Sequence, residues 1–279
     1  MRIGFIGAGK VGFSLGKYLS DHGVSLSGYF SRNPESALEA ANFTGTRSYN
    51  TIEELVQDSE VLFLTVPDGI ICQVWEQLKS MQIKGKVICH CSGVLSSDVF
   101  SDKAAFGCST YSIHPLLAVN SKLHSYKELS TTLFTIEGDD DRKSEMTALI
   151  ADCGNQVIAL APADKVRYHA AAVFASNLVL GLAQTAMEEL QQCGFSEEAA
   201  RGALAPFMMA NCSHMLEHSL DGCLTGPVER ADVGTVEKEL DCLKGDNREI
   251  YRLLSKKALK IARVKNPERD YEKLEGSLS

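Results

Sequence analysis

A short alanine-rich stretch, residues 163–177 (ADKVRYHAAAVFASN), carries side chains that could do chemistry. At about 100° per residue, Lys165, His169 and Ser176 fall within about 40° of one another on a helix. Asn177 projects to one side of this polar stripe. Because the neighbouring residues are small, this face could approach a bound molecule closely. We therefore expect it to form one wall of a site, whose ligand must be identified from the rest of the chain.

The N-terminus contains a glycine pattern typical of dinucleotide sites. A G-x-G-x-x-G follows an apolar run and precedes a helical pattern. In that context Gly7 permits a tight turn, Gly9 lets a pyrophosphate approach the backbone, and Gly12 allows close packing of helix on strand. The helix N-terminus also offers free N–H groups to phosphate. The residues expected to bind the cofactor here are Gly7, Ala8, Gly9, Lys10, Val11 and Gly12.

The end of the second apolar run predicts which cofactor is bound. An NAD site usually supplies an Asp or Glu to the ribose hydroxyls about 20 residues after the glycines. This chain has Ser31 and Arg32 there, in GYFSRNPES. An arginine fork beside a hydroxyl suits a 2′-phosphate, so we expect NADP(H). The alternative is an exposed arginine before a helix that Asn33 caps.

Two later turns are expected to complete the cofactor crevice. Val66-Pro67-Asp68 follows one apolar run, and Ser92 follows another in CSG. Ligands of open α/β sheets bind at the carboxyl ends of the strands, so we expect these turns to pass over the ribose and nicotinamide. Either turn could instead be only a connection.

The elements that must position these residues change character along the chain. Strand-like runs alternate with helical patterns up to about residue 161, at RIGFIG, SLSGYF, EVLFLTV, KVICHC, CSTYSI, TLFTI and NQVIAL. This rhythm predicts an α/β fold, a Rossmann-like and mainly parallel sheet with both faces covered. Afterwards only helical patterns remain, so we expect an all-α domain at 162–279 after a cofactor domain at 1–161. The expected helices cover 165–193, 196–220 with a break near Pro206, 233–244 and 247–264. The charged tail, residues 265–279 (KNPERDYEKLEGSLS), is expected to be frayed or extended.

Composition disfavours several classes of partner. The net charge of -8 and the pI near 5.4 argue against nucleic acid, which requires a basic surface. We also do not expect attachment to a membrane, because the sequence shows neither a separate apolar leader nor an uninterrupted run of about 18 apolar residues. Nine cysteines without a C-x-x-C pair predict neither a disulfide framework nor a zinc site, and they fit a reducing cytoplasm. The H-x-x-E-H match at 214–218 is too short to predict a metal.

Taken together, these motifs resemble a superfamily of two-domain reductases that includes 6-phosphogluconate dehydrogenase, ketopantoate reductase and pyrroline-5-carboxylate reductase. GFIGAGKVG, FSRNPES and VLFLTVPDGII look like its shared N-terminal half. HCSGVLSSD, SIHPL, DKVRYHAAAVFASN and LTGPVERADVGTVEKEL look like a branch in which a Rossmann-like domain precedes its own helical domain. Alternative ketopantoate reductases are similar to that branch. One departure is Glu239, where the branch tends to have histidine.

The resemblance implies that the first helix of the second domain faces the nicotinamide. In ketopantoate reductases and 6-phosphogluconate dehydrogenases this helix supplies a lysine and, four residues on, an asparagine. Lys165 matches the lysine, and His169 takes the asparagine position. In 2-oxo acid reduction, hydride reaches the carbonyl carbon and an acid protonates the oxygen. Lys165 or His169 is expected to be that acid, and Asn177 to bind the substrate; the alternative is an exposed Lys165 and a packing His169.

Three further residues are expected at the substrate. Ser176 shares the polar stripe, and His114 in SIHPL either enters the site or is structural. Thr225 begins a T-G-P loop resembling one that closes on substrate in pyrroline-5-carboxylate reductases, where a neighbouring subunit contributes it. The resemblance thus implies a homodimer through the C-terminal helices.

The sequence therefore predicts an NADPH-dependent oxidoreductase that reduces a small, ketopantoate-like 2-oxo acid. One alternative is an imine reductase of the pyrroline-5-carboxylate type, which needs no Lys165 because an iminium already carries its proton. Another is an NADP(H)-binding sensor without turnover.

Overall fold

An eight-stranded sheet forms the centre of the first of two structural units. The computed structural model describes residues 1–279, divided into units Met1–Ser176 and Asn177–Ser279. The sheet has the order β3-β2-β1-β4-β5-β6-β7-β8, and all neighbouring strands are parallel except β6 and β7. The strands are β1 Ile3–Ile6, β2 Leu26–Phe30, β3 Arg47–Ser48, β4 Val61–Leu64, β5 Val87–His90, β6 Ser109–Pro115, β7 Phe134–Gly138 and β8 Val157–Ala159. The prediction of a Rossmann-like, mainly parallel sheet is confirmed.

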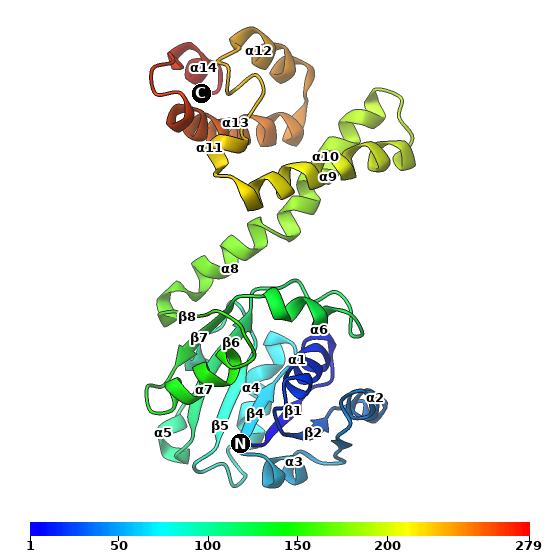
Figure 1. The fold of residues 1–279 in the computed structure, drawn as a ribbon, viewed down its shortest axis with the longest axis vertical. Helices are drawn as coiled ribbons and strands as arrows, with labels where there is room; N and C mark the ends of the chain where they lie inside the picture. Colours follow the sequence, from blue (N-terminus) through cyan, green and yellow to red (C-terminus); the bar gives the residue numbers. More distant parts are fainter. The chain divides into compact units, whose positions relative to one another are not determined.

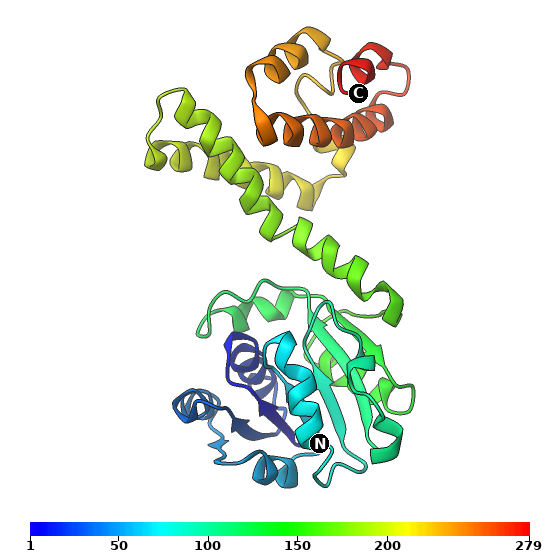
Figure 2. The same ribbon diagram turned by 180° about the vertical axis from the view of Figure 1, so that it is seen from behind.

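Helices cover both faces of this sheet (Figure 1). On one face lie α1 Lys10–Asp21, α2 Pro34–Thr44 and α7 Lys143–Ala151. On the other lie α3 Ile52–Asp58 and α4 Asp68–Leu78, and α4 is the cyan helix in Figure 2. Because both faces are buried, β1, β4 and β5 read as continuous apolar runs rather than as alternating ones.

Helix starts in this unit follow signals visible in the sequence. The Asn33 side chain accepts a hydrogen bond from the Glu35 backbone, and Pro34 occupies the first turn of α2. Thr51 accepts from the Glu54 backbone at the start of α3. These caps satisfy backbone N–H groups that have no partner within the helix, so they fix where each helix begins.

Short elements complete the first unit. They are η1 Ser97–Val99, α5 Lys103–Phe106, α6 Ser125–Glu128, η2 Leu129–Thr131, η3 Pro162–Asp164 and α8 Lys165–Phe174. The last strand ends at Ala159, close to the expected domain boundary near 161, whereas the compact unit continues through α8 to Ser176.

The second unit is entirely helical, as predicted. It contains α9 Asn177–Gln192, α10 Glu197–Glu217, α11 Leu220–Cys223, α12 Val233–Cys242, α13 Gly245–Lys265 and α14 Glu272–Ser277. The helices α9 and α10 pair as a hairpin in Figures 1 and 2. A separate apolar core joins α12, α13 and α14.

Three predictions about the helices are wrong. The helix expected over 165–193 is interrupted at Ala175 and Ser176. The helix α10 continues through Pro206 without a break, although proline removes one backbone N–H from its hydrogen-bond ladder. The charged tail is neither frayed nor extended, because Leu274 and Leu278 have no exposed surface and pack in the core of the second unit.

One stretch is long and apolar enough, by length and composition alone, to cross a membrane: Pro162–Gln192. A single such stretch is weak evidence. Its first helix also carries Lys165, whose ammonium is bound within the first unit.

Candidate functional site

The glycine turn after β1 has the geometry of a phosphate cradle. Gly7 has φ 110°, and a Cβ there would lie 2.6 Å from the Thr65 carbonyl oxygen. A Cβ on Gly12 would lie 2.3 Å from Thr65 Oγ1, so packing against β4 requires both glycines. At Gly9, by contrast, a Cβ would meet nothing closer than 4.0 Å, and no side chain caps α1. The first turn of α1 therefore keeps free N–H groups beside open space, which fits a pyrophosphate.

A cavity of about 300 Å³ extends from this turn along the carboxyl edge of β1, β2 and β4. Arg32 and Ser31 line it at the end of β2, and Gln73 and Gln77 line it from α4. The other lining residues are Ile6, Gly7, Ala8, Gly9, Phe30, Ile52, Thr65, Val66, Pro67, Ile70 and Val74. The residues present thus fit a dinucleotide, with Arg32 available for a 2′-phosphate.

Some of the predicted cofactor residues do not line this cavity, and two residues that do line it, Gln73 and Gln77, were not predicted. Lys10 and Val11 form the first turn of α1, and the Asp68 carboxylate accepts a hydrogen bond from the Ser92 hydroxyl at 2.9 Å. Gln73 and Gln77 were missed, although their spacing of four places them on one face of the helix that begins after Pro67.

The turn after β5 is fixed by a buried histidine. Ser92 N donates to His90 Nδ1 at 3.1 Å, so the neutral ring carries its proton on Nε2 and donates to the Ser96 carbonyl, also at 3.1 Å. Burial lowers the pKa of His90 to about 4, which keeps the ring neutral at physiological pH. The sequence placed His90 only within the strand-like run KVICHC, so this function of His90 was not predicted.

A buried carboxylate holds the far end of the same turn. Glu137 on β7 is 2% exposed, and its two oxygens accept from the backbone N and the hydroxyl of Ser97, each at 2.7 Å. The Asp68 carboxylate of α4 accepts from the Ser92 hydroxyl, so side chains of α4, β5 and β7 together hold the segment 92–97. A turn held in this way is preorganised for a ligand.

Lys165 is buried beneath this turn rather than exposed on the first turn of α8. Its side chain is 1% exposed, and its ammonium donates to the Ser92 carbonyl at 2.9 Å and to Ser112 Oγ at 2.7 Å. Burial lowers the pKa of Lys165 to about 8. The alternative of an exposed first-turn lysine is therefore wrong.

Two histidines close on the backbone of Gly93. A Cβ on Gly93 would lie 2.8 Å from His169 Nδ1 and 2.9 Å from His114 Nε2, so only glycine fits between the rings. His169 Nδ1 is buried without a hydrogen-bond partner. Burial, and next the charge of Lys165, lower the pKa of His114 to about 3. The structure thus brings together three predicted residues, Lys165, His169 and His114, at the turn that contains Ser92.

Tyr168 joins this cluster and was missed by sequence reasoning. Its hydroxyl lies 2.7 Å from His114 Nδ1, and the two rings meet edge-on, with centroids 5.6 Å apart. The signal was its position three residues after Lys165, which places it one helical turn further along the same side of α8.

The remaining predicted site residues lie farther along the chain. Ser176 ends the first unit, and its hydroxyl donates to the Ala172 carbonyl at 2.7 Å. Asn177 begins α9, and Thr225 is an exposed residue of the loop between α11 and α12; both lie in the second unit. Their roles stay predictions. Glu239 accepts a hydrogen bond from the Tyr251 hydroxyl, so it links α12 to α13 within that unit.

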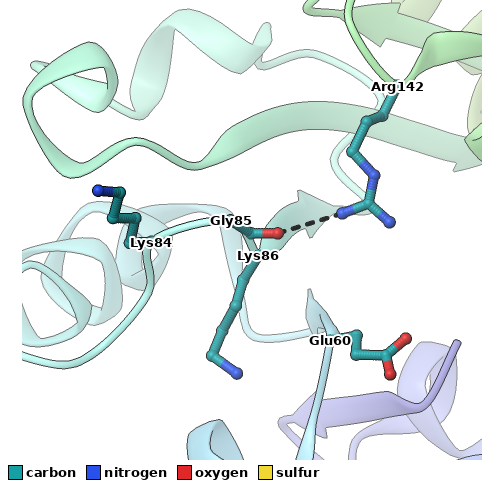
Figure 3. A pocket seen from close by; sticks show the side chains of 5 residues that line it. All are labelled: Glu60, Lys84, Gly85, Lys86 and Arg142. Carbon is teal, nitrogen blue, oxygen red and sulfur yellow. Dashed lines mark hydrogen bonds between the residues drawn. The ribbon is translucent and has the colours of Figure 1, made fainter.

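A larger cavity of about 550 Å³ lies at the opposite, amino-terminal edge of the sheet (Figure 3). Two of its cationic groups, those of Arg142 and Lys86, already have partners in the first unit. The Arg142 guanidinium pairs with Glu145 and donates to the Gly85 carbonyl, while Lys86 donates to the Ser59 carbonyl. We therefore locate the candidate site at the carboxyl edge, where the cofactor cavity and the buried cluster share neighbouring strands.

Two family models match separate parts of the chain. Residues 2–92 match a domain described as NADP oxidoreductase, coenzyme F420-dependent, and residues 132–258 match a domain of unknown function, DUF2520. A Bacillus subtilis protein provisionally named 6-phosphogluconate dehydrogenase YqeC is 30% identical over 89 residues. That match covers 32% of this chain and 30% of the other protein.

Solved structures share the fold over nearly the whole chain. A protein of Thermotoga maritima superposes with a TM-score of 0.77 at 24% identity, covering 95% of this chain and 99% of that one. Pyrroline carboxylate reductase of Plasmodium falciparum, solved with NADP bound, gives 0.62 at 13% identity, covering 94% and 98%. The solved structures show the shared fold alone. The domain matched at residues 2–92 is that of an NADP oxidoreductase, which bears out the predicted enzyme class and cofactor.

Proposed function

We propose that this protein uses NADPH to reduce a small 2-oxo acid of the ketopantoate type by hydride transfer. When bound, the cofactor supplies the hydride, and Arg32 with Ser31 would hold its 2′-phosphate. The protein itself must orient the carbonyl, exclude water and deliver a proton to the oxygen.

What carries this proposal is the position of Lys165. Its buried ammonium binds the Ser92 carbonyl at the end of β5, two strands from the glycine turn of β1 in the sheet order. A cation at that edge favours the binding of a carboxylate and the development of negative charge on a carbonyl oxygen. His114, Tyr168 and His169 surround the same turn and supply further polar groups.

NADPH oxidation by the purified protein tests this proposal, with ketopantoate as substrate and with NADH in parallel. We expect turnover that prefers NADPH. Tight NADPH binding without oxidation by ketopantoate or other 2-oxo acids would contradict it, and would leave the imine reductase and the non-catalytic sensor as the alternatives.

The imine alternative is distinguished by its demand for an acid. An iminium substrate already carries its proton, so loss of a proton donor should hardly slow its reduction. Reduction of 1-pyrroline-5-carboxylate by the wild-type protein, with little loss both in Lys165→Met, which removes the buried cation, and in Tyr168→Phe, which removes a neighbouring hydroxyl proton, would favour the imine reductase.

We also propose that the protein is a cytoplasmic homodimer joined through helices of the second unit, with neither nucleic acid nor a membrane as partner. Large apolar side chains on α9 and α10 support the dimer, because Leu180, Phe207 and Met209 are 72, 70 and 68% exposed. Analytical ultracentrifugation should give twice the mass of the 30.3 kDa chain. A monomer at micromolar concentration would contradict this part of the proposal.

A further inference from the structure

The acid that protonates the substrate oxygen must reach that oxygen. Lys165 does not meet this requirement well, because its side chain is 1% exposed and its ammonium already donates to Ser92 and Ser112. His169 directs a buried Nδ1 at the backbone of Gly93. Tyr168 and His114 are also half-buried, and their polar atoms lie within hydrogen-bonding distance of each other.

Of these two, only Tyr168 holds a transferable proton at neutral pH. Burial lowers the pKa of His114 to about 3, so its imidazolium is scarce at pH 7. Burial raises the pKa of the Tyr168 hydroxyl, so that group is protonated throughout the physiological range. A phenol is also a competent general acid when its conjugate base is stabilised.

The surroundings of Tyr168 can stabilise that conjugate base. In the tautomer protonated at Nδ1, the His114 ring donates to the phenol oxygen across 2.7 Å, so this hydrogen bond does not use the Tyr168 proton. The Thr135 side chain is a second polar neighbour that lowers the pKa of Tyr168 and so favours its phenolate. The Lys165 ammonium lies 5.8 Å from the centroid of the Tyr168 ring and adds positive charge. A phenolate here would therefore have a hydrogen-bond donor and a nearby cation.

We propose that the Tyr168 hydroxyl is the acid that protonates the substrate oxygen, while His114 holds this hydroxyl and stabilises the phenolate left behind. The inference rests on the proposed reduction of a carbonyl. As hydride forms the new C–H bond, the C=O π pair moves to oxygen, and the O–H bond of Tyr168 breaks to form the alcohol O–H. Water then returns a proton to the phenolate, so one hydride and one proton are consumed in each cycle. Lys165 acts as a positioning residue that fixes the turn and supplies charge.

Turnover of the Tyr168→Phe variant tests the catalytic assignment. The substitution keeps the ring against His114 and removes only the oxygen. We expect kcat with ketopantoate to fall about 10²- to 10⁴-fold, with the Kd for NADPH unchanged. The control is Tyr49→Phe, which removes another half-buried hydroxyl, bonded to Asp58, and should keep wild-type kcat. A Tyr168→Phe variant within about threefold of wild type would overturn the assignment and leave the proposed function intact.

A second measurement needs no substrate. Nitrogen-15 NMR of the imidazole rings, in the free protein and with NADP⁺, reports which nitrogen of His114 carries the proton. We expect Nδ1–H in the wild type and its loss in Tyr168→Phe. A ring protonated only at Nε2 would accept the tyrosine proton and turn it away from the substrate, which would overturn the inference whatever the substrate is. If no 2-oxo acid is reduced, the proposed function fails, and this tautomer still decides the role of Tyr168.

Discussion

At the scale of single residues, the cofactor cavity and the cluster around Lys165 are built in opposite ways. The cofactor half depends on missing side chains, since Gly7 and Gly12 let β1, α1 and Thr65 come together and Gly9 leaves room for phosphate. The chemical half depends on buried polar side chains, above all Lys165. Glycine spacing is visible in a sequence, whereas the burial of a lysine depends on what packs over it.

Arg32 should determine the preference for NADPH. We expect Arg32→Ala to raise the KM for NADPH about 10- to 100-fold, because a hydrogen bond to a charged group contributes about 1.5–3 kcal/mol. The KM for NADH should change little. Steady-state kinetics with both cofactors checks this, with Arg47→Ala as control, since the exposed Arg47 lies outside the cavity and pairs with Asp58. An equal effect on both cofactors would contradict the role.

Lys165 should produce a pH limit in activity. Its pKa is lowered to about 8 by burial, so the ammonium is present below about pH 8 and is lost above it. We expect kcat/KM of the wild type to fall as the pH rises through about 8. Lys165→Met should be slower by about 10²-fold or more at pH 7 and should lack this limb. A wild-type profile that stays flat from pH 7 to 9.5 would argue against an active ammonium.

Gly93 should tolerate no side chain. Gly93→Ala places a methyl group within 3 Å of nitrogen atoms of His114 and His169, so one ring must move. We expect at least a tenfold loss of kcat with NADPH binding retained. Gly69→Ala, where an added Cβ meets nothing within 4 Å, should behave like the wild type. Kinetics and NADPH fluorescence titration separate the two effects, and a fully active Gly93→Ala would show that the rings can yield.

At the scale of elements, the turn after β5 shows what could be read from the chain and what could not. Its position was predicted, because Ser92 directly follows a strand. Its fixation was not, because Glu137 lies 40 residues from Ser97 and Lys165 lies 73 residues from Ser92. No local pattern connects such distant residues.

The C-terminal helix α14 should be needed for the stability of the second unit. Leu274 has no exposed surface and packs in the core that joins α12, α13 and α14. We expect Leu274→Ala to lower the free energy of unfolding by about 2–5 kcal/mol. Leu253→Ala, at a side chain that is 50% exposed, should cost far less. Urea denaturation followed by circular dichroism measures the free energy of unfolding of both variants. A loss in Leu274→Ala as small as that in Leu253→Ala would mean that α14 is dispensable for stability.

At the scale of the whole molecule, buried neutral histidines should make stability depend on pH. The folded-state pKa of His90 is lowered to about 4 from 6.5, so between these values the unfolded chain binds more protons. Stability should therefore be complete above about pH 6.5 and fall as the pH approaches 4, by roughly 3 kcal/mol for this residue. His114 adds to the same trend. Denaturant unfolding at several pH values checks this, with a shallower dependence expected in His90→Gln; a slope as steep as that of the wild type would place the effect elsewhere.

The sequence by itself determined the features that depend on neighbours along the chain. The glycine turn, the Ser31-Arg32 pair, the helix starts at Asn33 and Thr51, and the change from strands to helices all follow from local spacing. Tertiary structure alone decided which side chains meet: Lys165 with Ser92, Tyr168 with His114, and Glu137 with Ser97. It also decided that the charged tail folds, since Leu274 and Leu278 are buried only by helices packed beside them. Periodicity indicates which face of an element is apolar, whereas the order of strands in the sheet sets which distant residues come within hydrogen-bonding distance.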